Sequence, residues 1–203
     1  VNYARKLGYG IKLLAISEKE KSPSKTEGSQ PLSIWVEPTL VPEDNPLAGV
    51  NGVNNAILVE GNPIGQVMFF GPGAGSGPTA SAVVADILNI AGIQSMSEDN
   101  IFNLDPLLSA KSWRNCHIAE KKQITKKNYI RLIAKDSPGV IGEIGTIFGK
   151  KKISIESIVQ FDVTDEEAEI VVITHKIQQG QLEEALLEIK NLSQVKRIAA
   201  TMG

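Results

Sequence analysis

The sequence predicts an α+β protein in which a strand-rich first part is followed by a ferredoxin-like βαββαβ domain. Residues 11–70 supply three or four strand-like segments and almost no helix. Residues 129–202 then alternate strand, helix, strand, strand, helix, strand, the order typical of two helices on one face of a four-stranded antiparallel sheet. A chain of 203 residues with 42% hydrophobic side chains can bury the cores of two such domains.

The first part opens with a short helical segment, YARKL, and an apolar strand from Ile11 to Ile16. The polar stretch Ser17–Pro31 has almost no apolar residues, which predicts an exposed loop. The next segment, LSIWVEPTLV, alternates like a strand. We expect that strand to be interrupted at Pro38, because proline lacks the N–H group that pairing requires. A turn-rich connection over residues 41–56 leads to AILVEG and IGQVMFF, which flank Gly61-Asn62-Pro63 and predict a hairpin.

A glycine-rich turn follows the hairpin in FFGPGAGSGPTASAVVADILNIAG. Its glycines alternate with other residues: Gly71, Gly73, Gly75 and Gly77. A helix from Pro78 to Ala91 is predicted next, and free N–H groups at a helix start favour an anion. No lysine follows the last glycine, as a P-loop requires, and Pro78 occupies the place of the third glycine of a dinucleotide fingerprint. A tight structural turn and a ligand-contacting turn both remain open.

The second domain is expected to begin after a region of weak periodicity. We predict a first domain over residues 1–100, a linker over 101–127, with at most a short helix and a strand near Trp113, and a second domain over 128–203. In DSPGVIGEIGTIFGKKK, Ser137 is the expected N-cap and Pro138 a first-turn residue. The helix has one apolar face, formed by Val140, Ile141, Ile144, Ile147 and Phe148. The remaining elements are strands ISIESIVQFDV and AEIVVITHK, helix QLEEALLEIKNL and strand VKRIAATM.

Composition argues against several classes of function. Basic and acidic residues number 21 and 23, and no basic block is dense enough to predict a nucleic-acid partner. A single cysteine, Cys116, and two histidines, His117 and His175, predict neither disulfides nor a metal site. No apolar run approaches the length of a membrane span and no signal peptide is recognisable, so the expected location is the cytoplasm, away from membranes.

Several motifs resemble known families. The segment KDSPGVIGEIGTIFGKKKISIESIVQ resembles the ACT domain, a small-molecule-binding module attached to many enzymes of amino-acid metabolism. The segments YARKLGYGIKLLAI, PTLVPEDNPLAGVNGVNNAILVEG and GQVMFFGPGAGSGPTASAVVADI resemble the carboxy-terminal half of bacterial homoserine dehydrogenases, in the family's order. The resemblance implies that residues 1–100 are a strand-rich remnant of that family's catalytic and dimerisation region, without its amino-terminal Rossmann domain.

This resemblance implies a reaction and a cofactor. The family transfers hydride reversibly between L-aspartate 4-semialdehyde and L-homoserine, with NAD or NADP, in the pathway towards threonine and methionine. By analogy, Gly75 contacts the cofactor through its backbone, Gly73 is a second contact, and the following helix packs against the nucleotide domain. The family's catalytic residues lie upstream of the region that matches Val1. No catalytic residue is therefore assigned here, and the chain alone is expected to be inactive, as a part of a longer parent chain.

For the second domain, the ACT resemblance implies an amino-acid effector, L-threonine, bound at the interface of a homodimer. The expected effector-binding residues are Asp136, Ser137, Gly139, Val140, Ile141, Ser154 and Ile155. N–H groups around Gly139 would hold the carboxylate and Asp136 the ammonium group, while Ser154 and Ile155 come from the second strand, of either subunit. Some effector-binding ACT domains carry asparagine where this chain has Ser154. The alternative is a dimerisation module, or a non-enzymatic amino-acid sensor of the ACT type.

Overall fold

The computed structural model of the protein describes residues 2–19, 31–95, 117–161 and 167–203. The chain divides into two compact units, each described below by itself. The first unit comprises Val1–Leu40 and Cys116–Gly203, and the second comprises Val41–Asn115. The domain limits expected from the sequence, at residues 100 and 127, stay a prediction, because residues 96–116 lie outside the described part of the chain.

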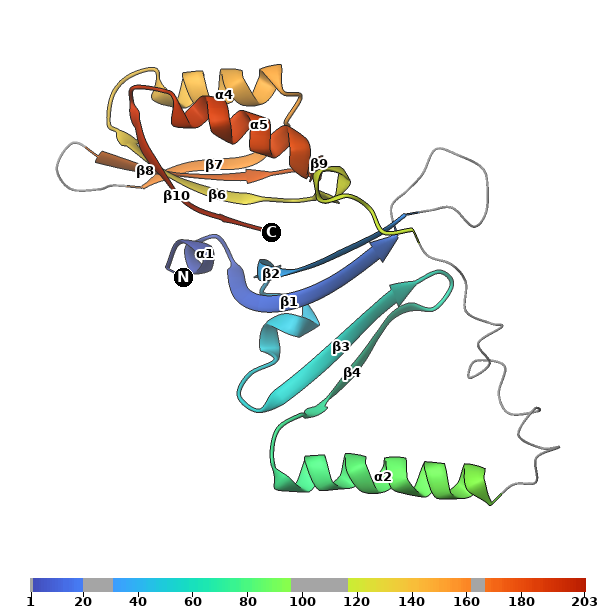
Figure 1. Cartoon of the computed structure of the whole chain (residues 1–203). Coiled ribbons are helices and arrows are strands. Elements are labelled where there is room, and N and C mark those ends of the chain that lie inside the picture. The colour runs from blue at the N-terminus through green and yellow to red at the C-terminus, as the bar shows by residue number, and fades with distance from the viewer. Residues whose placement is uncertain (1, 20–30, 96–116, 162–166) are drawn as a thin grey trace. The chain divides into compact units, whose positions relative to one another are not determined.

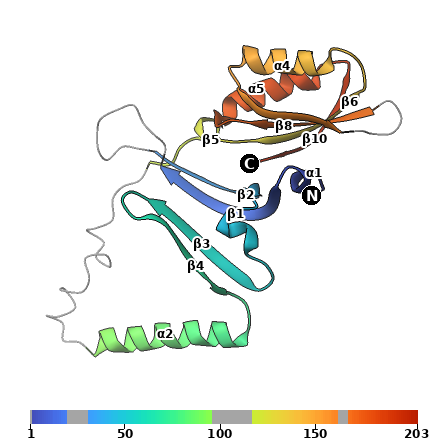
Figure 2. The same ribbon diagram turned by 180° about the vertical axis from the view of Figure 1, so that it is seen from behind.

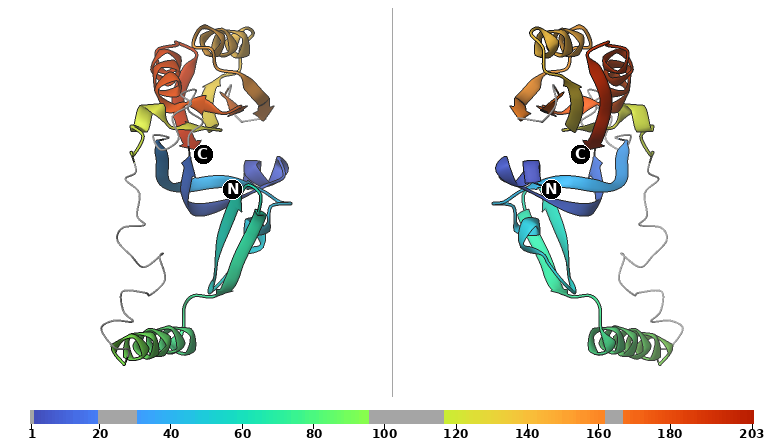
Figure 3. Two further views of the ribbon diagram at one scale, coloured as in Figure 1. Left: turned by 90° about the vertical axis from the view of Figure 1, so that its right-hand side faces the viewer. Right: turned by 90° about the vertical axis from the view of Figure 1, so that its left-hand side faces the viewer.

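A βαββαβ fold forms most of the first unit, as the sequence predicts. Its elements are β6 (Tyr129–Lys135), α4 (Val140–Lys150), β7 (Ile155–Phe161), β8 (Glu167–Thr174), α5 (Gln179–Lys190) and β10 (Val195–Met202). The four strands form one sheet in the order β10-β6-β8-β7, and each neighbouring pair is antiparallel. The two helices lie side by side on one face of this sheet, which confirms the ferredoxin-like arrangement (Figures 1 and 3).

The core between helices and sheet follows from the residue spacing. In β6, the side chains of Ile130, Leu132 and Ala134 join the core beneath the helices, while the alternating residues face the opposite side of the sheet. On α4, Ile144 and Phe148 are one helical turn apart and fully buried, and the α5 residues Ala185 and Ile189 repeat the same spacing. The helical and strand periods therefore place their apolar side chains in one shared layer.

Helix α4 begins later than the sequence predicts. Its first residue is Val140, and Gly139 occupies the N-cap position with φ 93°. The expectation that Ser137 caps the helix and that Pro138 lies in its first turn is therefore wrong. Glycine reaches this left-handed conformation without steric cost, so the chain turns at Gly139 rather than at Ser137. No side chain of the cap residue bonds to the helix start.

The opposite face of the sheet is covered by the amino-terminal elements of the same unit, α1 (Asn2–Lys6), β1 (Tyr9–Lys19) and β2 (Leu32–Pro42). Figure 2 shows α1 and β1 on the side of the sheet away from α4 and α5. A second apolar cluster forms between them. Its buried members, Tyr129, Val171 and Ile173, come from the sheet. Partly buried apolar side chains pack against them: Tyr3, Leu7, Tyr9, Leu40, Phe161, Ala200 and Met202. The first unit is thus a sheet covered on both faces.

Strand β2 runs unbroken through Pro38, so the predicted interruption is wrong. Strands β1 and β2 form a two-stranded sheet, in which each strand keeps one edge outside the pair. A proline is tolerated on an edge strand, because its missing N–H group can face away from the partner. Strand β1 also extends to Lys19, beyond the expected loop start at Ser17; residues 20–30 lie outside the described part.

The segment before β6 joins the β2 strand to the ferredoxin-like domain. It contains η3 (Lys121–Gln123) and β5 (Thr125–Lys126), and β5 pairs with β9 (Ile177–Gln178). The N–H group of Leu32 donates to the carbonyl of His117 at 2.8 Å, and that of Ala119 donates to the carbonyl of Leu32 at 3.0 Å. The strand expected near residues 113–118 is described only from residue 117 and forms an isolated bridge there between Leu32 and Ile118.

Two tyrosines of the second apolar cluster should make stability depend on alkaline pH. The neighbouring Glu169 carboxylate, as a hydrogen-bond acceptor and a negative charge, together with burial, raises the pKa of Tyr3 above its ordinary value of 10.0. Burial is the largest cause that raises the pKa of Tyr129. The folded chain therefore keeps these protons to higher pH than the unfolded chain, and the stability present below about pH 10 is lost as pH rises through the folded pKa values.

The measurement is urea unfolding, followed by circular dichroism, between about pH 8 and about pH 11. We expect the free energy of unfolding to fall above about pH 10, and to fall less steeply in Tyr3→Phe and least in the double variant with Tyr129→Phe. Identical pH profiles for all three proteins would contradict the assignment of this dependence to the two phenols.

The second unit contains η1 (Pro46–Gly49), β3 (Asn54–Gly61), β4 (Gly65–Pro72) and α2 (Ser76–Gln94). Strands β3 and β4 pair antiparallel from Asn54 with Pro72 to Gly61 with Gly65, which confirms the predicted hairpin. The helix predicted over residues 78–91 extends by two residues before Pro78 and by three beyond Ala91. None of the described helices combines the length and apolar character that crossing a membrane requires.

Candidate functional site

The glycine turn of the second unit connects β4 to α2, and its geometry requires glycine at two positions. A Cβ atom on Gly73 would lie 1.5 Å from the side-chain nitrogen of Asn55, so no other residue fits without moving Asn55. Gly73 also donates its N–H to the carbonyl of Val53 at 3.0 Å. Gly75 is the N-cap of α2 and has φ 129°, a conformation that other residues rarely adopt. The turn is therefore fixed against β3 by its backbone.

The start of α2 offers hydrogen-bond donors to a ligand. The N–H groups of Ser76 and Gly77 lie in the first helical turn, where no carbonyl one turn earlier can accept from them. No acidic residue lies in this turn, and no side chain caps it. Gly73 and Gly75 are exposed. The turn can therefore approach a polar or anionic group through its backbone, as the helix dipole favours.

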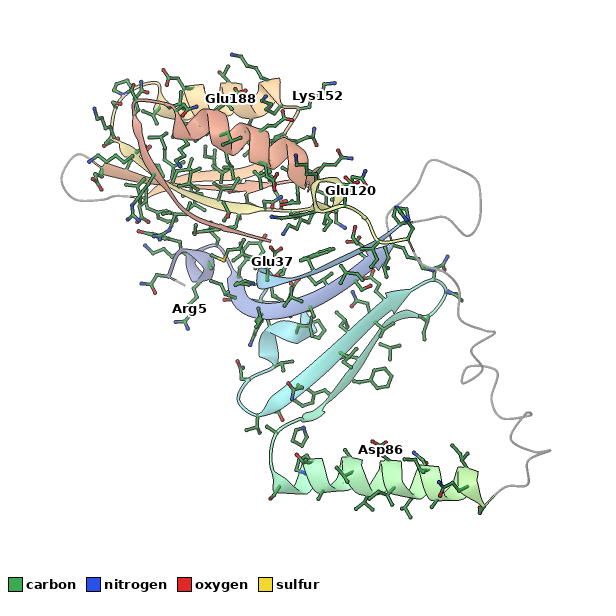
Figure 4. All side chains as sticks on the ribbon, in the orientation of Figure 1. Arg5, Glu37, Asp86, Glu120, Lys152 and Glu188 are labelled. Atoms are coloured by element: carbon green, nitrogen blue, oxygen red, sulfur yellow. The ribbon has the colours of Figure 1, made fainter. Side chains whose placement is uncertain are left out.

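Helix α2 lacks a covering layer in the described part of the second unit. None of its residues is buried, and its large apolar side chains are between 37% and 66% exposed: Val83, Val84, Ile87, Leu88, Ile90 and Ile93. Figure 4 shows the side chains projecting from the helix, with Asp86 among them. Apolar residues around an exposed helix mark a contact surface for another folded layer.

The predicted effector site lies in the first unit, between the end of β6 and the start of α4. Five of its residues are adjacent there: Asp136, Ser137, Gly139, Val140 and Ile141. The Asp136 carboxylate is exposed and accepts a hydrogen bond from the side-chain amide of Gln160, on β7, at 2.9 Å. The Gly139 carbonyl accepts from the Glu143 N–H at 2.9 Å, so the earlier N–H groups, of Val140 and Ile141, have no intrahelical acceptor. Val140 contributes only its backbone, because its side chain is buried in the core.

The other two predicted residues lie at the far end of the same sheet. Ile155 begins β7 and pairs with Thr174, whereas Lys135, next to Asp136, pairs with Glu167. These partners are seven residues apart along β8, roughly 23 Å at about 3.3 Å per residue. Ser154 is held at this far end, where its carbonyl accepts from the His175 N–H at 3.0 Å. One chain therefore does not bring Ser154 and Ile155 together with Asp136.

A cavity of about 460 Å³ lies along α4, with Leu192 after α5 in its lining, and shares only Gly139 with the predicted effector residues. Its lining includes Glu143, Thr146, Lys150 and Leu192. The Thr146 hydroxyl donates to the Gly142 carbonyl at 2.7 Å, within the helix. This cavity therefore begins at Gly139 and continues along α4, and Asp136 does not line it.

Two contacts of the first unit were not predicted from the sequence. Gln160 reaches Asp136 because β6 and β7 flank β8, both run antiparallel to it, and both end beside its first residues. Arg131 and Glu169 lie diagonally across the neighbouring strands β6 and β8, since Glu169 pairs with Ile133 and Arg131 with Val171, and their Nη1 and Oε1 atoms are 3.1 Å apart. Only the alternation within β6, which places Arg131 on the face away from the helices, hints at this ion pair.

The described residues contain no group of three or more His, Cys, Asp or Glu side chains placed to hold a metal ion. His175 lies 3.8 Å from Glu156, and its side chain is 56% exposed. Lys127 also pairs with Glu156, so this small cluster is a surface charge network. Asp86 lies on the exposed helix α2, and Lys12 lies on β1.

Comparison with known proteins identifies both parts of the chain. Residues 1–88 match the family described as homoserine dehydrogenase, and residues 128–194 match the ACT domain. A homoserine dehydrogenase of Synechocystis sp. is 47% identical over 202 residues, which cover 100% of this chain and 46% of that protein. One of Neisseria gonorrhoeae is 36% identical and is matched over 97% of this chain and 43% of its own length.

A solved structure supports the same relationship. The crystal structure of a homoserine dehydrogenase from Thiobacillus denitrificans aligns with a TM-score of 0.85 at 31% identity, over 100% of this chain and 44% of that chain. The chain thus spans less than half the length of each of these relatives.

Proposed function

Because residues 1–88 match the homoserine dehydrogenase family and residues 128–194 match the ACT domain, we propose that the chain is part of a homoserine dehydrogenase. In that role it contributes to the NAD- or NADP-dependent interconversion of L-homoserine and L-aspartate 4-semialdehyde, on the way to threonine and methionine. Its ACT domain binds an amino-acid effector, L-threonine. The observation that carries the regulatory part is the uncapped helix start at Gly139 beside the exposed Asp136 carboxylate.

In the second unit, the glycine turn between β4 and α2 would lie beside the bound nicotinamide cofactor. The Gly73 position has no room for a side chain, and Gly75 exposes backbone close to unbonded N–H groups of α2. These residues fit a backbone contact with a polar part of the dinucleotide. When bound, the cofactor accepts or donates the hydride, depending on the direction of the reaction, and the glycine turn would help to hold it in place. The exposed apolar side chains of α2 would pack against the domain that holds the dinucleotide.

The effector site requires charge of both signs. The free N–H groups of Val140 and Ile141 would hold the α-carboxylate, aided by the dipole of α4. The Asp136 carboxylate would accept from the α-ammonium group, in place of or together with the Gln160 amide. Both groups belong to one turn, so they can contact one small molecule.

The separation of Ser154 from Asp136 favours a homodimer. Strand β7 is an edge of the sheet, so its outer edge can pair with the same strand of a second copy. Antiparallel pairing about a two-fold axis places the start of one β7 beside the end of the other. Ser154 of the partner subunit would then approach Gln160 and Asp136. The site would be completed by two subunits, which is how Ser154 and Ile155 can take part.

The test combines calorimetric titration of the 203-residue chain with L-threonine and a homoserine oxidation assay with NAD and NADP. We expect threonine binding without turnover. Asp136→Asn should weaken binding at least about tenfold, because a charge-assisted hydrogen bond is lost. Asp86→Asn, an equal change of charge on α2, should leave the affinity unchanged.

Each part of the proposal can fail separately. Turnover by the chain would show that catalytic groups are present in it. Threonine affinity that is insensitive to Asp136→Asn would move the effector elsewhere. The absence of both binding and turnover would favour the alternative, an ACT domain that only mediates dimerisation.

A further inference from the structure

A second cavity of the first unit has no role in the proposed function. It has a volume of about 500 Å³ and lies between β2, the segment before β6, and α5. This volume falls within the range of small-molecule sites, roughly 300–1,000 Å³. None of the predicted effector-binding residues lines it. It is therefore a separate candidate site.

One wall of the cavity is apolar. Trp35 of β2 lines the cavity together with Ile124, from the segment before β6, and with Leu182 and Leu186 of α5. Leu182 and Ile124 are buried, so this wall is continuous with the core beneath α5. The indole Nε1 of Trp35 is itself buried and has no hydrogen-bond acceptor among the described residues. Buried donors are almost always bonded, which makes an unpaired one a sign of a missing partner.

The cavity also carries two ion pairs. Lys121 and Glu183 lie 3.7 Å apart and are well exposed, with side-chain exposures of 83% and 44%. Lys126 and Glu37 form a second, more sheltered pair, with exposures of 13% and 25%. Figure 4 labels Glu37 on β2. The lining thus offers two cations and two anions next to an apolar wall, and its charges balance.

We propose that this cavity binds a zwitterionic α-amino acid with an apolar side chain. The apolar side chain would pack on Trp35, Leu182 and Leu186. Lys121 would bind the carboxylate and Glu183 the ammonium group at the open end. Because Lys121 and Glu183 already pair with each other, a ligand that separates them must supply a partner for both, and a ligand with a single charge would leave one of the two without a counter-ion.

Trp35 gives a direct readout. The chain contains two tryptophans, Trp35 and Trp113, so Trp113→Phe leaves Trp35 as the single indole fluorophore. Titration with L-isoleucine should change its emission saturably. Two analogues, 3-methylpentanoate without the ammonium group and 2-methylbutylamine without the carboxylate, should bind at least about tenfold more weakly. Calorimetry on the chain with both tryptophans checks that Trp113→Phe does not itself create or remove the effect.

Matched variants locate the ligand. Lys121→Met and Glu183→Gln should each raise the Kd for L-isoleucine at least about fivefold. Lys122→Met and Glu184→Gln change the same charges on neighbouring residues outside the lining and should leave the Kd unchanged. Asp136→Asn should also leave it unchanged, which separates this site from the threonine site.

Three outcomes would overturn the proposal. L-Isoleucine could produce neither an emission change nor heat. The single-charge analogues could bind as well as the amino acid. The lining variants could behave like their matched controls. None of these outcomes bears on threonine binding at Asp136, so the proposed function would stand or fall separately.

Discussion

Replacing Phe148 with alanine should lower the free energy of unfolding of the first unit by about 3–5 kcal/mol. Phe148 is fully buried on α4, in the cluster that joins both helices to the sheet. The substitution removes a ring from a packed layer and leaves a cavity that its neighbours cannot fill completely. Its neighbours in that layer include Ile144 and Ile189, which are also fully buried. Urea unfolding followed by circular dichroism measures the change.

Leu187→Ala is the matched control for this prediction. Leu187 lies on α5, and 66% of its surface is exposed, so its truncation should change the free energy of unfolding by no more than about 0.5 kcal/mol. An equal loss in Phe148→Ala and Leu187→Ala would mean that the layer between helices and sheet does not carry the stability of the unit.

Arg131→Met should destabilise the first unit by about 1–3 kcal/mol, less than the loss of a fully buried ion pair because water screens part of the interaction. The side chains of Arg131 and Glu169 are 31% and 14% exposed. The second oxygen of Glu169, Oε2, is buried and has no hydrogen-bond partner among the described residues. Removal of the guanidinium group would therefore leave a sheltered carboxylate without its counter-ion.

A double-mutant cycle isolates the interaction. If the pair is coupled, Arg131→Met with Glu169→Met should lose less than the two single changes added, by at least about 1 kcal/mol. Lys196 and Glu167 form an ion pair whose side chains are 44% and 33% exposed, and the same cycle there should give less than about 1 kcal/mol. Additive losses at Arg131 and Glu169 would show that the two charges act independently.

The elements with clear periodicity were predictable from the sequence. Strand β10 begins at Val195 and ends at Met202, as VKRIAATM indicates, and the β3–β4 hairpin surrounds its predicted turn. The errors arose where a backbone conformation decides the boundary. Ser137 has the side chain of an N-cap, but Gly139 has the φ that starts α4. The β5–β9 pairing was not predictable, because two-residue strands carry no period.

The candidate sites also differ in how far the sequence could predict them. Asp136 and Gly139 lie together because they are near in the sequence, and the ACT resemblance located them. Gln160 meets Asp136 only through the order of strands, and the cavity beside Trp35 exists only because β2 packs beside α5. Neither contact leaves a local pattern in the sequence, because Gln160 and Asp136 are 24 residues apart and β2 and α5 are separated by more than a hundred.

The contact between Leu40 and Gly203 has a consequence for synthesis on the ribosome. The Leu40 N–H donates to the Gly203 carbonyl at 2.7 Å, and Ala200 and Met202 pack in the same cluster as Tyr3 and Tyr9. At typical translation rates, β10 emerges on the order of 10–30 s after β2. During that interval the apolar side chains of α1 and β1 lack the cover that Ala200 and Met202 of β10 give them in the folded unit.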